Sequence, residues 1–80
     1  MEYYIGLIAL LPYNFSPMGW YLCNGMTLQI SQNSALFSLI GTTYGGDGMT
    51  TFTIPNMLGL EPVPGMNYYI CAYGLYPTRP

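Results

Sequence analysis

Charged side chains are nearly missing from this sequence, because only Glu2, Asp47, Glu61 and Arg79 carry a charge in 80 residues. Globular proteins ordinarily have charge on about a quarter of their residues, and surface charge keeps neighbouring molecules apart in solution. A domain of this length also buries only about 60% of the surface that its unfolded chain exposes. The sparse charge and the small core together predict that another protein surface covers part of this chain.

Several classes of partner and location are excluded by the same residues. The longest apolar run, from Tyr3 to Leu11, is much shorter than the roughly 20 residues that span a membrane, and Pro12 ends it. Glu2 stands where a signal peptide carries positive charge, so we expect no recognisable signal peptide and another route of export. Arg79 alone cannot neutralise the phosphates that dominate nucleic-acid binding. We therefore expect no membrane span and no nucleic-acid partner.

Short apolar segments separated by glycine and proline predict a small, mostly β fold. The Asn24-Gly25 pair is typical of a type I′ turn, so we expect a tight hairpin around it. The expected strands are residues 2–11, 20–23, 26–29, 51–54 and 67–76, and the expected loops are residues 12–19 and 58–67.

One segment changes to a helical period. Ser31 is a suitable residue for the helix start, and Gly41 is a suitable residue to end it in a left-handed conformation. The sequence therefore predicts an α+β fold, with one short helix on a small sheet, as a single domain over residues 1–80. The apolar stripe expected to dock on the sheet consists of Ala35, Leu36, Leu39 and Ile40.

Tyrosine-rich strand patterns begin and end the chain. The two ends can pair with each other or with a neighbouring molecule, since neither is blunted by charge along its length. Tyrosine can stack on sugars, but its apolar ring and polar tip also suit protein interfaces, which we favour here. We expect a charged substitution such as Tyr69→Glu to dissociate the assembly. The predicted self-assembly interface consists of Tyr3, Tyr4, Ile5, Tyr68, Tyr69, Ile70 and Tyr73.

The glycine-rich stretch from Gly41 to Gly48 has two interpretations. Its glycines permit positive φ and Asp47 can bond its own turn, which indicates a structural loop. A phosphate-binding loop would need a lysine, and a calcium loop would need several carboxylates. The alternative is a glycan contact through Tyr44 and Asp47. The residues of the predicted loop are Tyr44, Gly45, Gly46, Asp47 and Gly48.

The sequence offers little for catalysis. It has no histidine, and its three carboxylates lie far apart along the chain, so we expect no enzyme, no catalytic site, no cofactor and no metal. The two cysteines, Cys23 and Cys71, either form a structural disulfide in an oxidising compartment or remain two buried thiols.

A set of motifs in one continuous register carries a resemblance to a known family. The motifs are Phe15-x-Pro17-x-Gly19-Trp20, Cys23-x-Gly25, Ile30-Ser-Gln-Asn33, Leu36-Phe37-x-Leu39, Gly41-Thr-Thr-Tyr-Gly-Gly-Asp-Gly48, Thr50-Thr-Phe52 and Pro55-Asn56. Over residues 5–59 they closely resemble the phage tail collar domain, which is also found in microcystin-dependent proteins of bacteria. The last residues, from Met66 to Pro80, resemble the C-terminal strand of the same proteins.

The chain departs from that family between Gly59 and its last strand. Family members commonly insert a long segment with glycine and histidine there, which resembles the receptor-binding and metal-binding head of short tail fibres. This chain passes to its last strand within about eight residues, so the resemblance brings over neither receptor or lipopolysaccharide binding nor a metal site. Met49 and Met57 also stand where basic residues are usual.

The resemblance implies a collar-like fold that assembles into trimers or fibres of phage tails and related particles. Because the polypeptide starts with its own methionine and contains only the collar, we expect a subunit that polymerises with itself through terminal strands and tyrosine-rich faces. Other tail or fibre proteins are further expected partners. The expected location is extracellular or the surface of a virion or particle. The alternative is a tail-tip or adhesin-type module that recognises a cell-surface glycan or receptor.

Overall fold

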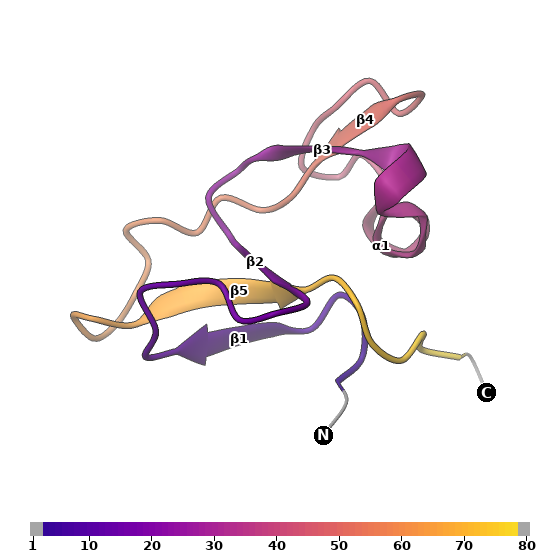
Figure 1. The fold of residues 1–80 in the computed structure, drawn as a ribbon. Coiled ribbons are helices and arrows are strands. Elements are labelled where there is room, and N and C mark those ends of the chain that lie inside the picture. The colour runs from indigo at the N-terminus through magenta and orange to yellow at the C-terminus, as the bar shows by residue number, and fades with distance from the viewer. Residues whose placement is uncertain (1–2, 79–80) are drawn as a thin grey trace.

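Figure 1 shows the computed structural model, which describes residues 3–78, so that Glu2 and Arg79 lie outside the described residues. The architecture is mostly β with one short helix, which confirms the predicted α+β class. The elements are β1 (Ile8–Leu11), β2 (Trp20–Leu22), β3 (Thr27–Gln29), the 3-10 helix η1 (Ile30–Gln32), α1 (Ser34–Ile40), β4 (Thr51–Thr53) and β5 (Asn67–Cys71).

The strands form two separate antiparallel sheets. The larger has the order β1-β5-β2, and the smaller pairs β3 with β4. In the larger sheet Ile70 of β5 lies opposite Ile8 on one side and Tyr21 on the other. The last strand of the chain is therefore the central strand, and the two ends of the chain pair with each other inside one molecule (Figure 1).

The predicted hairpin at Asn24-Gly25 is wrong. β2 pairs with β5 and β3 pairs with β4, so the chain passes from one sheet to the other at this point. Asn24 does not adopt the positive φ that a type I′ turn requires. Its side-chain Oδ1 instead accepts a hydrogen bond of 3.0 Å from the backbone N–H of Met26, which forms a turn of another kind.

The helix begins two residues later than predicted, because its N-cap is Asn33 and not Ser31. Ser31 lies in η1, and Asn33 takes the position before α1. The Asn33 side chain is buried, donates from Nδ2 to the carbonyl of Gln29 at 3.1 Å and accepts at Oδ1 from the Tyr21 hydroxyl at 3.1 Å. Gly41 ends the helix with φ 56°, as predicted.

The hydrophobic core lies between the larger sheet on one side and α1 with β4 on the other. Leu36 and Phe52 are fully buried there, and the ring of Phe37 lies 5.4 Å from that of Phe52 between centroids. Leu39 is exposed, so the predicted apolar stripe of α1 is wrong at this residue and Phe37 takes its place. The buried cluster consists of Ile5, Cys23, Leu36, Phe52, Ile54, Ile70 and Ala72.

The second face of the larger sheet is covered by the segment between β1 and β2. Figure 1 shows this segment crossing β5, and the Tyr69 hydroxyl donates to the carbonyl of Tyr13 at 2.7 Å. The ring of Tyr3 packs edge-on against Trp20 on the same sheet, with centroids 5.6 Å apart. Because both faces are covered, neighbouring residues of β5 such as Tyr69 and Ile70 are both buried.

Both terminal strands are shorter than predicted. β1 starts at Ile8 because Gly6, with φ 92°, forms a bulge opposite Cys71. The N–H of Gly6 donates to the Cys71 carbonyl at 2.8 Å, and the N–H of Cys71 donates to the Leu7 carbonyl at 2.9 Å. β5 ends at Cys71 because the next two N–H groups both turn to the carbonyl of Gly19.

Candidate functional site

The first and last described segments are joined beyond the larger sheet. Tyr4 and Leu75 form a parallel bridge. The N–H of Ile5 donates to the Leu75 carbonyl at 2.8 Å, and the N–H of Leu75 donates to the Tyr3 carbonyl at 2.9 Å. Gly74 permits this approach, because a Cβ at its position would collide with the Tyr3 carbonyl oxygen. The two ends thus form one continuous piece of surface.

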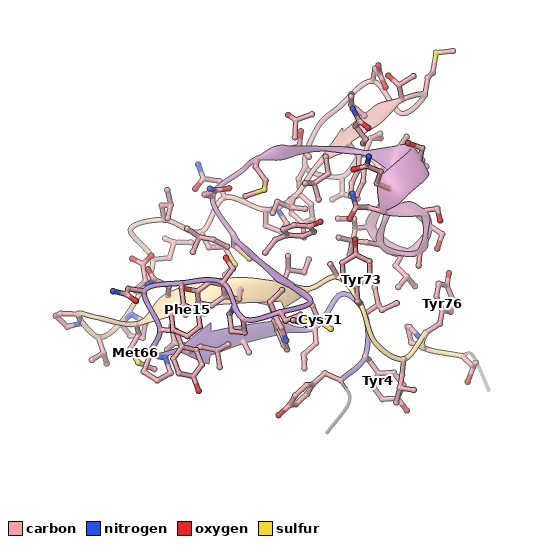
Figure 2. The ribbon with its side chains drawn as sticks, in the orientation of Figure 1. Tyr4, Phe15, Met66, Cys71, Tyr73 and Tyr76 are labelled. Carbon is pink, nitrogen blue, oxygen red and sulfur yellow. The ribbon has the colours of Figure 1, made fainter. Side chains whose placement is uncertain are left out.

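This surface is rich in exposed aromatic side chains. Tyr4 is 57% exposed and Tyr73 is 59% exposed. In Figure 2 the side chains of Tyr73 and Tyr76 point toward the helical part of the fold, and Tyr4 lies on the side away from it. The described residues carry only two charged side chains, Asp47 and Glu61, and neither belongs to the terminal segments. We call this set the terminal aromatic surface: Tyr3, Tyr4, Tyr73, Leu75 and Tyr76.

Two of these rings are held by hydrogen bonds to the helical part of the fold. The hydroxyls of Tyr76 and Ser38, which is on α1, are 2.7 Å apart. The Tyr73 hydroxyl donates to the carbonyl of Gln32 at 3.4 Å. Fixed rings lose less conformational entropy on binding than free ones, which favours a binding surface at this place.

Tyr21 of β2 is a half-buried hydrogen-bond donor that neighbours Tyr73. Burial, followed by the neighbouring Tyr73, raises the pKa of the Tyr21 hydroxyl above its usual value. The hydroxyl donates a hydrogen bond to Oδ1 of Asn33 at 3.1 Å. That bond links β2 to the start of α1, next to the segment that carries Tyr73.

Three residues of the predicted self-assembly interface lie inside the molecule. Ile5, Tyr69 and Ile70 are buried, and Tyr69 is only 1% exposed because the segment around Tyr13 covers it. Tyr68 is half-buried. The charge of Tyr69→Glu would enter the interior, so we now expect this substitution to unfold the protein rather than dissociate an assembly.

The exposed members of the predicted interface are Tyr3, Tyr4 and Tyr73. Sequence reasoning did not include Leu75 and Tyr76, which follow the last strand. The predicted last strand, residues 67–76, contained both residues, but the prediction did not assign them to the interface.

The glycine-rich loop is organised by the Asp47 carboxylate. Its Oδ1 accepts backbone N–H bonds from Met49 at 2.8 Å, Thr50 at 2.8 Å and Thr51 at 2.9 Å. Its Oδ2 accepts from the Thr50 hydroxyl at 2.9 Å. These bonds, first among them that from the Thr51 N–H, hold the pKa of Asp47 well below its usual range. The carboxylate is engaged by its own turn, which fits a structural loop.

Gly46 is where this loop touches the core. It has φ 98°, and a Cβ at this position would collide with Cα of Phe52 and lie 2.7 Å from the Thr51 carbonyl oxygen. Gly45 and Gly48 also have positive φ. The loop therefore packs its backbone directly on β4, and glycine is required at the contact.

A pocket of about 400 Å³ lies beside this loop. Tyr44, which is 48% exposed, and Asp47 do not line it, so the two side chains predicted as a glycan contact do not share this pocket. Its surface is mostly apolar, although four of its lining residues have uncharged polar side chains. The lining residues are Gln29, Ile30, Ser31, Met49, Thr50 and Thr51.

The two cysteines are buried free thiols on opposite faces of the larger sheet. Cys71 lies opposite Trp20, three positions before Cys23, which corresponds to about 10 Å along the strands. A disulfide requires Cα atoms within about 7 Å. The structure therefore has two buried thiols in place of a disulfide. Burial raises the pKa of Cys23 to about 11 and also raises that of Cys71.

The other reactive groups are dispersed. Oε1 of Glu61 accepts a bond of 3.0 Å from the N–H of Gly59 in its own loop. Between residues 3 and 78, no three side chains of the metal-binding types are grouped together. The same part of the chain contains no helix that is long and apolar enough to cross a membrane.

Comparison with known proteins supports the interpretation of the fold. Residues 6–62, more than two-thirds of the chain, match the Phage Tail Collar Domain family. No match is found among curated proteins or among solved structures. The family is structural, and membership implies association with phage tail proteins on a virion-associated particle. The chain belongs to the phage tail collar domain family, whose role in phage tail fibres is structural rather than enzymatic.

Proposed function

We propose that this protein is a structural subunit of a phage-tail-like particle and that its copies associate through the terminal aromatic surface. The observation that carries the proposal is the pairing of Tyr4 with Leu75, which joins the two segments that carry the exposed aromatic side chains. Solvent-exposed aromatic clusters without charge are typical of protein interfaces. A place outside the cell or on the surface of a virion belongs to the same proposal, as do other tail proteins as additional partners.

The exposed area of the terminal aromatic surface is too small for a stable interface by itself, so we expect a second contact between copies. Each of the four tyrosines leaves roughly 100 Å² exposed, so the terminal aromatic surface offers about 400 Å² per copy. A stable interface takes about 800 Å² from each partner. The surface is therefore large enough to contribute about half of a stable interface.

Substitution of one exposed tyrosine tests the proposal. Tyr4→Glu places a charge in the terminal aromatic surface, and the matched control Tyr44→Glu places the same charge at another exposed tyrosine, in the glycine-rich loop. Light scattering should show a loss of assembly for Tyr4→Glu and wild-type assembly for Tyr44→Glu, with both variants folded by circular dichroism. Equal assembly of the two variants would refute the proposal.

A second candidate function is binding of a cell-surface glycan beside the glycine-rich loop. The pocket lined by Gln29, Ser31 and Thr50 supports it, because uncharged hydrogen-bonding groups suit sugar hydroxyls. A glycan array with the wild-type protein and with the Gln29→Ala variant tests this function. Glycan binding by the wild type that is lost in Gln29→Ala would favour this second function. An array without any binding would refute it, and only the structural role would remain.

A further inference from the structure

β1 is an outer strand of the larger sheet, and half of its backbone groups point away from β5. In an antiparallel pair, alternate residues turn their N–H and C=O groups toward the partner strand. The bond from the Cys71 N–H to the Leu7 carbonyl fixes this alternation, so Ala9 and Leu11 face β5. The N–H and C=O groups of Ile8 and Leu10 therefore point outward, and no protein group within residues 3–78 bonds them.

The chain itself bonds outward groups of β2 and β4, and the outer edge of β3 is polar. On β2 the N–H of Trp20 bonds the Pro17 carbonyl at 3.0 Å, and the Leu22 carbonyl accepts from Asn24 at 2.8 Å. On β4 the Thr53 N–H bonds the Gly45 carbonyl at 3.1 Å. The outer edge of β3 carries the exposed polar residues Thr27 and Gln29.

β1 has none of these protections. Its sequence from Ile8 to Leu11 is Ile-Ala-Leu-Leu, and all four residues are half-buried. It contains no charge, proline or bulge, which are the usual features that keep an edge strand from pairing with another molecule. The bulge at Gly6 and the proline at position 12 only mark its two ends.

We propose that β1 of one copy pairs antiparallel with β1 of a second copy across a two-fold axis at Ala9. In this register Ile8 of each copy lies opposite Leu10 of the other, and both residues present their free backbone groups to the interface. Four hydrogen bonds result, and the two three-stranded sheets become one sheet of six strands. The next outward position is Pro12, which has no N–H, so the ladder ends there. The strand is thus complementary to itself, which identifies a second copy as its partner.

This inference rests on the proposed function. The pairing of β1 strands is the second contact that assembly requires in addition to the terminal aromatic surface. A two-fold pairing closes on itself and yields only a dimer. Growth into a fibre needs a second, different interface, which the terminal aromatic surface provides. The two surfaces therefore have separate roles, one in forming the dimer and one in joining dimers.

Cysteine cross-linking tests the register. At the two-fold axis, Ala9 faces its own copy in a non-hydrogen-bonded pair, where Cα atoms are about 4.5 Å apart, within the range of a disulfide. Leu11 is on the same face, but the two copies of this residue would lie about 13 Å apart. With oxidised glutathione, Ala9→Cys should give a covalent dimer on a non-reducing gel, and Leu11→Cys should remain monomeric. Equal cross-linking of both variants, or none for Ala9→Cys in an intact assembly, would overturn the pairing.

Proline substitution tests the hydrogen bonds. Leu10→Pro removes an N–H that points outward, so the bonds between β1 and β5 are kept. Thr27→Pro removes an outward N–H from the polar edge of β3 and serves as the control. Leu10→Pro should raise the dissociation constant of the dimer at least about tenfold, because each dimer loses two hydrogen bonds. A dimer that is unaffected by Leu10→Pro, or equally affected by Thr27→Pro, would contradict the proposal.

The two proposals fail in different ways. Wild-type fibres in which Ala9→Cys does not cross-link would refute β1 pairing and leave assembly through the terminal aromatic surface. A dimer that cross-links through Ala9→Cys but never grows would support β1 pairing and refute the fibre. A wild-type protein that is monomeric at all concentrations would refute both.

Discussion

Tyr4 lies opposite Leu75 in a parallel bridge, so the first and last described segments of the chain are hydrogen bonded to each other. This pairing satisfies backbone groups at both ends while the aromatic side chains remain outside. Backbone groups of the two segments are thereby hydrogen bonded within one molecule. Their exposed side chains remain available for contacts with other molecules.

Acid should destabilise the protein through Asp47. Hydrogen bonds lower the pKa of Asp47 in the folded state below the unfolded value of about 3.9, so its contribution to stability is present above that value. The contribution is lost as the pH falls through the folded-state pKa. Thermal unfolding should therefore show a lower Tm for Asp47→Asn than for the wild type at pH 7, with the difference shrinking toward pH 2.

Glu61→Gln is the control for this prediction, because the Glu61 carboxylate accepts one hydrogen bond, from Gly59, where that of Asp47 accepts four. It should change Tm much less than Asp47→Asn at pH 7. A difference between wild type and Asp47→Asn that is the same at every pH would show that the charge of Asp47 does not hold the loop.

Alanine at Gly46 should be far more harmful than alanine at Gly59. Both glycines have positive φ, at 98° and 85°, so both substitutions carry the backbone strain of about 1–2 kcal/mol. Only at Gly46 would the new Cβ collide with β4, since nothing lies within 4 Å of it at Gly59. Urea unfolding should show Gly46→Ala to be at least about 2 kcal/mol less stable than Gly59→Ala. Equal stabilities would mean that the loop does not pack on Phe52 as described.

Truncation of the buried helix residue should remove a large part of the stability. Leu36 is fully buried, and Leu36→Ala should cost about 2–5 kcal/mol in the free energy of unfolding. Leu58→Ala, at a leucine that is 52% exposed in a loop, should cost about 0.5 kcal/mol or less. Chemical denaturation of the two variants measures the difference, and similar costs would contradict the placement of the core.

Both cysteines should resist thiol reagents in the folded protein. Burial raises the pKa of Cys23 to about 11, so its thiolate fraction at pH 8 is more than about a hundredfold lower than that of a free cysteine. Cys71 is buried as deeply. A chromogenic disulfide reagent should react rapidly with two thiols in denaturant. In native buffer both thiols should react much more slowly. Rapid reaction of the native protein would contradict the burial of these side chains.

The sequence predicted the short elements well where a local rule controls them. Gly41 ends the helix at a positive φ, and Phe52 and Ile54 alternate with threonines along a half-exposed strand. The family motifs identified the fold over most of the chain.

The sequence failed where distant partners decide. Asn24-Gly25 has the composition of a hairpin turn, but β2 and β3 each find a better partner elsewhere, so the local preference is overridden. Tyr69 was expected in a self-assembly interface because the last strand is rich in tyrosine and carries no charge. Here the segment around Tyr13 covers the second face, a contact between residues 56 positions apart that no local pattern reveals.

Negative-stain electron microscopy of the wild-type protein at low micromolar concentration, with light scattering on the same sample, tests the central claim most directly. Assembly through the terminal aromatic surface and β1 predicts regular fibres or other large particles that scatter far more light than one chain. Monodisperse particles of one to three chains would contradict the fibre and would assign the exposed aromatic residues to a different partner.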